Sequence, residues 1–178
     1  MKILVKTLLL GFIASTVFFS CKKNDNNNNT ETLSTQDRNF IMQAAIGNTA
    51  EIQAGQLADS TTDTSLVQNF ATMLVNDHQS AQSDLKSVGS QVNANVPDSA
   101  NAYHMMLLDT LRGYSGRAFD SAFIMNQIMD HTEAINQYQA EASAGNNTAV
   151  MNYANTHLPV LQKHLNTADS IATVMNFK

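Results

Sequence analysis

Two Asp-His pairs stand inside apolar helical patterns and are the most chemically distinctive feature of this sequence. The first is Asp77-His78 and the second is Asp130-His131. Ionisable side chains at such positions are costly unless they have partners. Imidazole binds transition metals, and a neighbouring carboxylate either binds the same ion or orients the imidazole by accepting a hydrogen bond. The two pairs therefore mark a candidate site.

Two further polar residues, Glu51 and His164, lie on comparable stripes of the other long helical segments. Residues three or four apart are neighbours on a helix face, so all these side chains can meet in the middle of a bundle. The predicted metal ligands are Glu51, His78, His131 and His164, with Asp77 and Asp130 as added ligands or as hydrogen-bond acceptors. These donors suit Fe, Zn, Cu or Mn. The alternative is that each histidine is a structural core residue, hydrogen bonded to an acid on a neighbouring helix.

The spacing of apolar residues predicts an all-α domain. Only 7 of the 178 residues are Gly and 2 are Pro, and apolar residues recur with the helical period over long stretches. The expected long helices cover residues 34–59, 66–92, 118–143 and 148–175, with a short connecting helix over 100–111. Pro159 lies inside the last helix, where it removes a backbone donor and should kink or split it.

An internal repeat relates the two halves of the domain. A shift of 83 residues places Asp37 on Asp120 and the triplet Phe40-Ile-Met42 on Phe123-Ile-Met125. The same shift, without a gap, also matches residues of the following helices. One helical hairpin used twice predicts an antiparallel four-helix bundle with a pseudo-two-fold axis. Chance identity between amphipathic helices is the alternative explanation.

The beginning of the chain has the pattern of an export signal. A short basic start precedes an apolar run over residues 8–19, which is too short for a comfortable membrane span. The run ends at Ser20-Cys21, which resembles the lipobox of bacterial lipoproteins, although Phe18 stands where Leu or Val is usual. Cys21 is the only cysteine, and a lipid on its thiol explains an otherwise unpaired residue. We expect a lipoprotein signal peptide over 1–20; a plain secreted protein with a free thiol is the alternative.

The rest of the chain divides into a linker and one domain. Residues 22–30 contain no apolar side chain, so we expect 21–33 to be a disordered tether. Residues 34–178 have the size of a single domain. The 15 acidic residues outnumber the 10 basic ones, and the domain has no Lys/Arg cluster, which argues against nucleic-acid binding. We expect the domain to lie in a bacterial cell envelope, anchored to a membrane by its lipid, in the periplasm or at the cell surface.

Several motifs across the domain resemble those of the DUF4142 family, a bacterial envelope family placed among ferritin-like four-helix bundles. They are Asp37-Arg-Asn-Phe40, Gly47-Asn-Thr-Ala-Glu51, Phe70-Ala-Thr-Met-Leu-Val-Asn-Asp-His78, Gly116-Arg-Ala-Phe-Asp120, Met129-Asp-His131 and Leu158-Pro-Val-Leu-Gln-Lys-His164. The resemblance implies a ferritin-like fold, and no established activity comes with it. Ferritin di-iron centres use Glu-x-x-His on two helices. Here Val75 and Leu161 stand three residues before His78 and His164, so the di-iron motif is missing.

Two functions of different classes fit these observations. The main prediction is a binding or interaction module with an unknown protein partner, held at the membrane by Cys21. The alternative is a metal-binding protein, a metal buffer or a redox centre, with a His/Glu site in the bundle core. The sequence has no Gly-x-Ser-x-Gly nucleophile motif and no glycine-rich phosphate loop, so it does not predict an enzyme.

Overall fold

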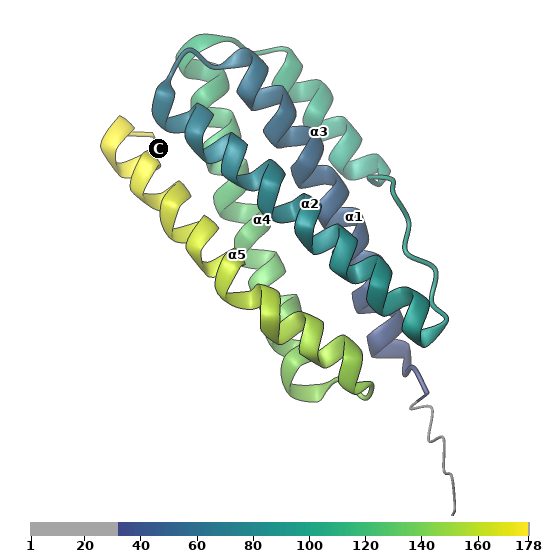
Figure 1. Ribbon diagram of the computed structural model, residues 1–178. Helices are drawn as coiled ribbons and strands as arrows, with labels where there is room; N and C mark the ends of the chain where they lie inside the picture. The colour runs from purple at the N-terminus through teal and green to yellow at the C-terminus, as the bar shows by residue number, and fades with distance from the viewer. Residues whose placement is uncertain (1–31, 178) are drawn as a thin grey trace, which may run out of the picture.

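The computed structural model describes residues 32–177, and these form five α-helices (Figure 1). The helices are α1 (Thr35–Thr61), α2 (Ser65–Val92), α3 (Ala102–Arg112), α4 (Gly116–Ala144) and α5 (Thr148–Met175). No strand occurs within residues 32–177, so the predicted all-α class is confirmed. The predicted signal peptide, the lipid site at Cys21 and most of the predicted tether lie outside the described residues. None of the five helices is both long and apolar enough to span a membrane.

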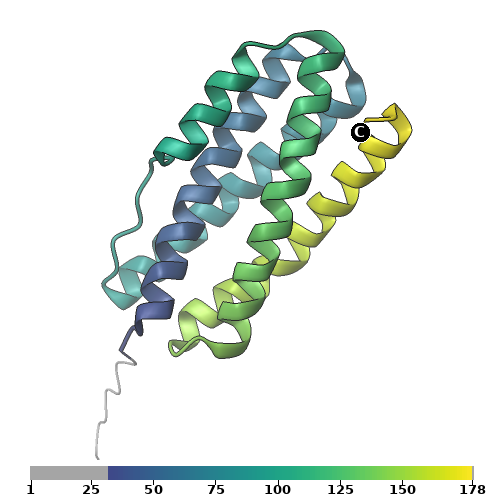
Figure 2. The same ribbon diagram turned by 180° about the vertical axis from the view of Figure 1, so that it is seen from behind.

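The four long helices form two hairpins. α1 packs along α2 and α4 packs along α5, joined by short connections over residues 62–64 and 145–147. The hairpins meet where α2 contacts α5 and where α1 contacts α4. The short helix α3 lies on the outside, against α1 and α4, and Figure 2 shows it beside α1. The hairpin pairing predicted from the repeat is therefore present.

A polar layer separates the core into two apolar clusters. One cluster is built around Phe70, Phe119 and Phe123, and the other around Phe40 and Tyr153. Along each long helix, the polar side chains of this layer fall between residues of the first cluster and residues of the second. The buried polar side chains of this layer are Asn48, Glu51, His78, Gln82, Gln127, His131 and His164. The candidate site thus lies in the middle of the bundle.

The sequence repeat has a structural counterpart at the two hairpin loops. Asp37, near the start of α1, accepts hydrogen bonds from two backbone N–H groups of the α4–α5 loop, at 2.9 and 3.1 Å. Asp120, near the start of α4, accepts hydrogen bonds from the hydroxyls of Thr62 and Thr64 in the α1–α2 loop, at 2.6 and 2.5 Å. Each aspartate therefore fastens the loop of the other hairpin, and the 83-residue shift relates the two arrangements.

Of the two predicted effects of Pro159, a kink or a split, the split does not occur, because helix α5 is continuous through the proline, and the kink stays a prediction. Proline leaves the carbonyl one turn earlier without its helical partner. Pro159 is exposed, as is Asn155, which carries that carbonyl, so water is able to take the place of the missing donor. His157 and Leu161 on the two sides of the proline are buried in the core. Packing on both sides holds the helix together.

Candidate metal centre

Three histidines from three different helices converge in the polar layer. They are His78 on α2, His131 on α4 and His164 on α5, and all three are buried. One ring nitrogen of each lies within 4.8 Å of the corresponding nitrogens of the other two. The shortest separation, 3.1 Å, joins Nε2 of His131 to Nδ1 of His164. This is the spacing of ligands around one ion, so the proton on each ring decides what the site can do.

The outer nitrogen of His131 is a donor. Its Nδ1 lies 3.0 Å from the backbone carbonyl oxygen of Gln127, which only accepts hydrogen bonds. Nδ1 therefore carries the proton of the neutral ring, and Nε2, which faces His164, presents a lone pair.

The outer nitrogen of His164 is also a donor. Its Nε2 lies 2.9 Å from Oδ2 of Asp77, one helix away on α2. A carboxylate accepts hydrogen bonds, so Nε2 carries the proton and Nδ1 presents a lone pair toward His131. A carboxylate in this position also orients the ring and raises its basicity as a ligand.

The third ring follows the same pattern through an amide. Nδ1 of His78 lies 3.1 Å from Oδ1 of Asn48. The orientation of this amide is set because its Nδ2 donates to Oε1 of Gln82 at 3.3 Å and to the hydroxyl of Tyr153 at 3.1 Å. Nδ1 of His78 is therefore the donor, and its Nε2 is buried without a hydrogen-bond partner.

The centre thus presents three lone pairs and no proton between them. Burial lowers the pKa of His131 to about 3, lowers the pKa of His78 well below its ordinary value, and lowers that of His164, which Asp77 opposes. At neutral pH the rings are uncharged. Two nitrogens bound to one metal at about 2.1 Å lie roughly 3.0–3.4 Å apart for angles between 90° and 109°, which matches the 3.1 Å separation.

Glu51 and Asp130 do not join this group. Oε1 of Glu51 lies 3.9 Å from Nδ1 of His131, the nitrogen that faces away from His164. Asp130 accepts a hydrogen bond from Asn126 at 2.8 Å and bonds to none of the three rings. The reason is the helical position of each residue, because Asp130 is rotated by about 100° from His131 around α4. Of the four proposed ligands, the structure brings together the three histidines.

The Glu51 carboxyl is itself unusual. Burial and, after it, the nearby charge of Asp130 raise its pKa to about 8, and Gln127 opposes the shift. Its Oε2 is buried without a hydrogen-bond partner. At neutral pH this residue is a protonated, uncharged acid beside the histidines.

A cavity of about 250 Å³ reaches His78 and His131 from the side of α3. Glu51 and Asp130 line it, together with His104, which sits on α3. His104 was not among the residues that the sequence singled out for the site, because it falls in the connecting segment. The lining residues that carry charge or a ring nitrogen are Glu51, His78, His104, Asp130, His131 and Glu133.

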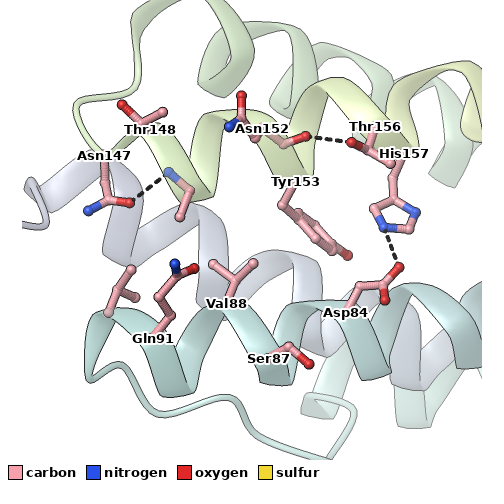
Figure 3. Close-up of a pocket in the computed structure, with 12 residues that line it drawn as sticks. Asp84, Ser87, Val88, Gln91, Asn147, Thr148, Asn152, Tyr153, Thr156 and His157 are labelled. Carbon is pink, nitrogen blue, oxygen red and sulfur yellow. Dashed lines mark hydrogen bonds and ion pairs between the residues drawn. The ribbon is translucent and has the colours of Figure 1, made fainter.

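A larger open groove of about 750 Å³ runs between α2 and α5 (Figure 3). Its lining is mostly polar and uncharged. His157 and Asp84 contact each other at one end, with Nε2 3.2 Å from Oδ2, as Figure 3 shows. The ring of His157 also lies against Tyr153, with centroids 4.5 Å apart. His157 does not belong to the three-histidine group.

Comparisons with known proteins agree with the fold. A DUF305 fragment from Deinococcus radiodurans has a similar solved structure, with a TM-score of 0.66, 10% identity, and coverage of 79% of this chain and 97% of that chain. At this identity the likeness shows the helical fold alone. A comparison with curated proteins gives no match. Residues 22–171 match the DUF4142 family, described as a domain of unknown function, and the chain therefore belongs to this family.

Proposed function

We propose that this domain binds one divalent transition-metal ion through His78, His131 and His164. The observation that supports the proposal is the protonation pattern of the rings. Each ring donates its only proton outward, to a carbonyl, a carboxylate or an amide oxygen. The three inward nitrogens are ligands without protons, and two of them are 3.1 Å apart.

A purely structural role for the histidines explains this pattern less well. Two neutral histidines that fix the register of a bundle share one N–H···N hydrogen bond. Here the proton of each ring is on the outer nitrogen, which bonds to the Gln127 carbonyl in His131 and to Asp77 in His164. Neither of the two facing nitrogens is therefore able to donate such a bond. A second proton on one ring would restore it, but burial opposes a charged imidazolium. A metal cation between the rings would accept the lone pairs that now face one another without a proton.

The donor set narrows the choice of metal. Three imidazoles suit Zn, Cu or Fe, whereas Ca and Mg prefer oxygen donors. A di-iron centre needs several carboxylates, and the carboxylate beside the rings, Glu51, lies outside the ligand group. We therefore propose a mononuclear site, used as a metal buffer or as a redox centre.

We also propose the setting of this site. The cross-bracing of the two hairpins by Asp37 and Asp120 supports a ferritin-like antiparallel bundle with a pseudo-two-fold axis. The lipobox-like pattern ending at Cys21 supports a lipid-anchored protein of a bacterial envelope. An interaction module stays a prediction, and the groove between α2 and α5 is the surface that favours it.

Elemental analysis of the full-length chain, purified without chelator or affinity tag, tests the proposal. We expect one Zn, Cu or Fe ion per chain, and we expect His131→Ala and His164→Ala to abolish metal uptake while the helical circular dichroism persists. His157→Ala is the matched control, because it removes a buried histidine outside the group. A metal-free chain that gains no thermal stability from added Fe, Cu, Zn or Mn would overturn the proposal.

A further inference from the structure

The cavity beside the histidines connects the proposed ligands to the outside of the bundle. His78 and His131 line its inner end and are almost fully buried. Its outer end is lined by residues of α3 and its N-cap, among them Tyr103, which is 51% exposed, and by the exposed Glu133 of α4. The cavity therefore leads from a solvated rim to two of the three histidines.

The chemistry of the lining favours cations. Three carboxyl side chains, those of Glu51, Asp130 and Glu133, line the cavity, and no Lys or Arg does. Glu51 is only 7% exposed, and its Oε2 has no hydrogen-bond partner. Even as a neutral acid, Glu51 offers this buried oxygen to a passing cation, and the contact would relieve the cost of leaving the oxygen without a partner.

His104 adds a nitrogen ligand near the rim. Its Nδ1 donates to Oδ1 of Asn101 at 2.8 Å, so its Nε2 presents a lone pair in the neutral ring. Asp130, the neighbour of His131 on α4, lines the same stretch of the cavity. The His104 ring and the carboxyl groups of Asp130 and Glu51 thus line the same cavity as His78 and His131.

We propose that divalent transition-metal ions reach the three histidines through this cavity, passing His104 and Asp130 and then Glu51. The proposal rests on the proposed function, because it names the route by which that site is loaded. His104, Asp130 and Glu51 bind the ion only in transit, since they do not form a tight ligand group of their own. We therefore expect the rate of metal uptake to depend on these three residues, and we expect the number of ions bound at equilibrium to be independent of them.

A competing route lies on the opposite side, between α2 and α5. The open groove there ends at the His157–Asp84 pair. Beyond that pair, the space next to His164 and Asp77 is about 10 Å³, which is barely enough for one water molecule. This side is the narrower of the two, so it serves as the alternative in the test.

Gly47 gives a direct way to block the proposed route. It lies on α1 in the lining of the cavity, and a Cβ placed there meets no atom within 4 Å. A side chain can therefore start from this position without a clash at its Cβ, and Gly47→Leu is the variant chosen to fill the cavity. Gly47→Ala is the matched control, because it makes the same change in helix propensity and leaves the cavity open.

Stopped-flow absorption with Co²⁺ and the metal-free full-length chain measures uptake. We expect Gly47→Leu to slow binding by about tenfold or more, and to slow release to a chelator by the same factor, because a plug leaves affinity unchanged. Gly47→Ala should behave as wild type. The double variant His104→Ala, Asp130→Asn should slow uptake severalfold with a weaker dependence on salt, since attraction of a cation falls with ionic strength. Asp169→Asn, an exposed acid on α5, is its control.

Three results would overturn the route. One is wild-type uptake by Gly47→Leu with its helical content intact. The second is slower uptake only in Asp84→Asn, which would place the route between α2 and α5. The third is a wild-type chain that binds no Co²⁺ and no Zn²⁺, which removes the proposed function together with its route. If Gly47→Leu loses its helical content, the double variant decides the question alone.

Discussion

Glu51 supplies the sharpest test of how the polar layer affects stability. Its side chain is buried, and its pKa is raised to about 8 by burial and by Asp130, with Gln127 opposing. In the unfolded chain the same carboxyl titrates near 4.5. Glu51→Gln keeps the shape of the neutral acid and removes its ionisation, so the variant isolates the effect of the proton.

The direction in which Glu51 changes the free energy of unfolding with pH depends on whether the folded or the unfolded chain binds its proton. Between pH 4.5 and pH 8 the folded chain keeps the Glu51 proton, and the unfolded chain releases it. The free energy of unfolding contributed by this group therefore falls as the pH rises, by about 1.4 kcal/mol per pH unit. At about pH 7 the loss amounts to roughly 3 kcal/mol, and below pH 4.5 it vanishes. Glu51→Gln escapes this loss.

Urea denaturation of the metal-free chain, followed by circular dichroism, measures the difference. We expect Glu51→Gln and wild type to have similar free energies of unfolding near pH 4.5, and the variant to gain a growing advantage toward pH 8, at unchanged m-value. Glu133→Gln, the same change at an exposed position, should stay within about 0.5 kcal/mol of wild type throughout. An advantage of Glu51→Gln that is independent of pH would refute the argument, because it would mean that the folded chain does not hold the proton.

The remaining predictions concern the histidines, a loop contact and two glycines. The metal-free chain should lose stability as the pH falls below 6.5, because His131 binds a proton there in the unfolded chain but stays unprotonated in the folded chain until about pH 3. The free energy of unfolding should fall by about 1.4 kcal/mol per pH unit for this residue, and urea denaturation of His131→Gln at each pH should lack this contribution. Asp120→Ala should cost about 2–3 kcal/mol in thermal denaturation, since two threonine hydroxyls lose their acceptor, and a wild-type Tm would contradict the proposed cross-brace. Gly47→Ala should stabilise the chain by up to about 1 kcal/mol, because a Cβ at that position meets no other atom. Gly89→Ala should destabilise the chain, because its Cβ would lie 2.4 Å from a methyl carbon of Val96, and equal effects of the two substitutions would contradict this difference in packing.

The helices were predictable from sequence because their apolar periodicity is a local property. Ser34 and Asp37 mark the start of α1 as a capping box, and the structure places the helix there. The continuity of α5 through Pro159 was not predictable, because it depends on burial of the residues on both sides of the proline in the core. Local preference was overridden by packing, which the sequence pattern does not measure.

The convergence of the histidines followed from their helical positions, but their chemistry did not. Which nitrogen each ring turns inward depends on Asn48, on the carbonyl of Gln127 and on Asp77. The sequence pointed to Asp77, but it treated Asp130 as its equivalent, and only Asp77 reaches a ring. Asn48 was visible as a polar residue on the inner face of α1, three positions before Glu51. Its amide contacts needed the structure, because they join α1 to two other helices, α2 and α5.

The repeat explains why three histidines converge and a fourth does not. The 83-residue shift relates Asn48 of α1 to His131 of α4. In each hairpin this position contacts the histidine of the following helix: Asn48 bonds to His78, and His131 lies against His164. The first copy uses an amide that orients a ring, and the second copy uses a ring that is itself a proposed ligand.

This asymmetry has a consequence for the metal. With histidine in both copies the rings would supply four nitrogens, as in a closed structural site. With Asn48 in one copy, three nitrogens remain, and the side of α1 that carries Asn48 and Glu51 faces the 250 Å³ cavity. Three protein ligands beside an accessible space are the arrangement of metal sites that exchange their ion or bind a further ligand. The divergence between the two halves of the repeat is therefore what makes the proposed site accessible.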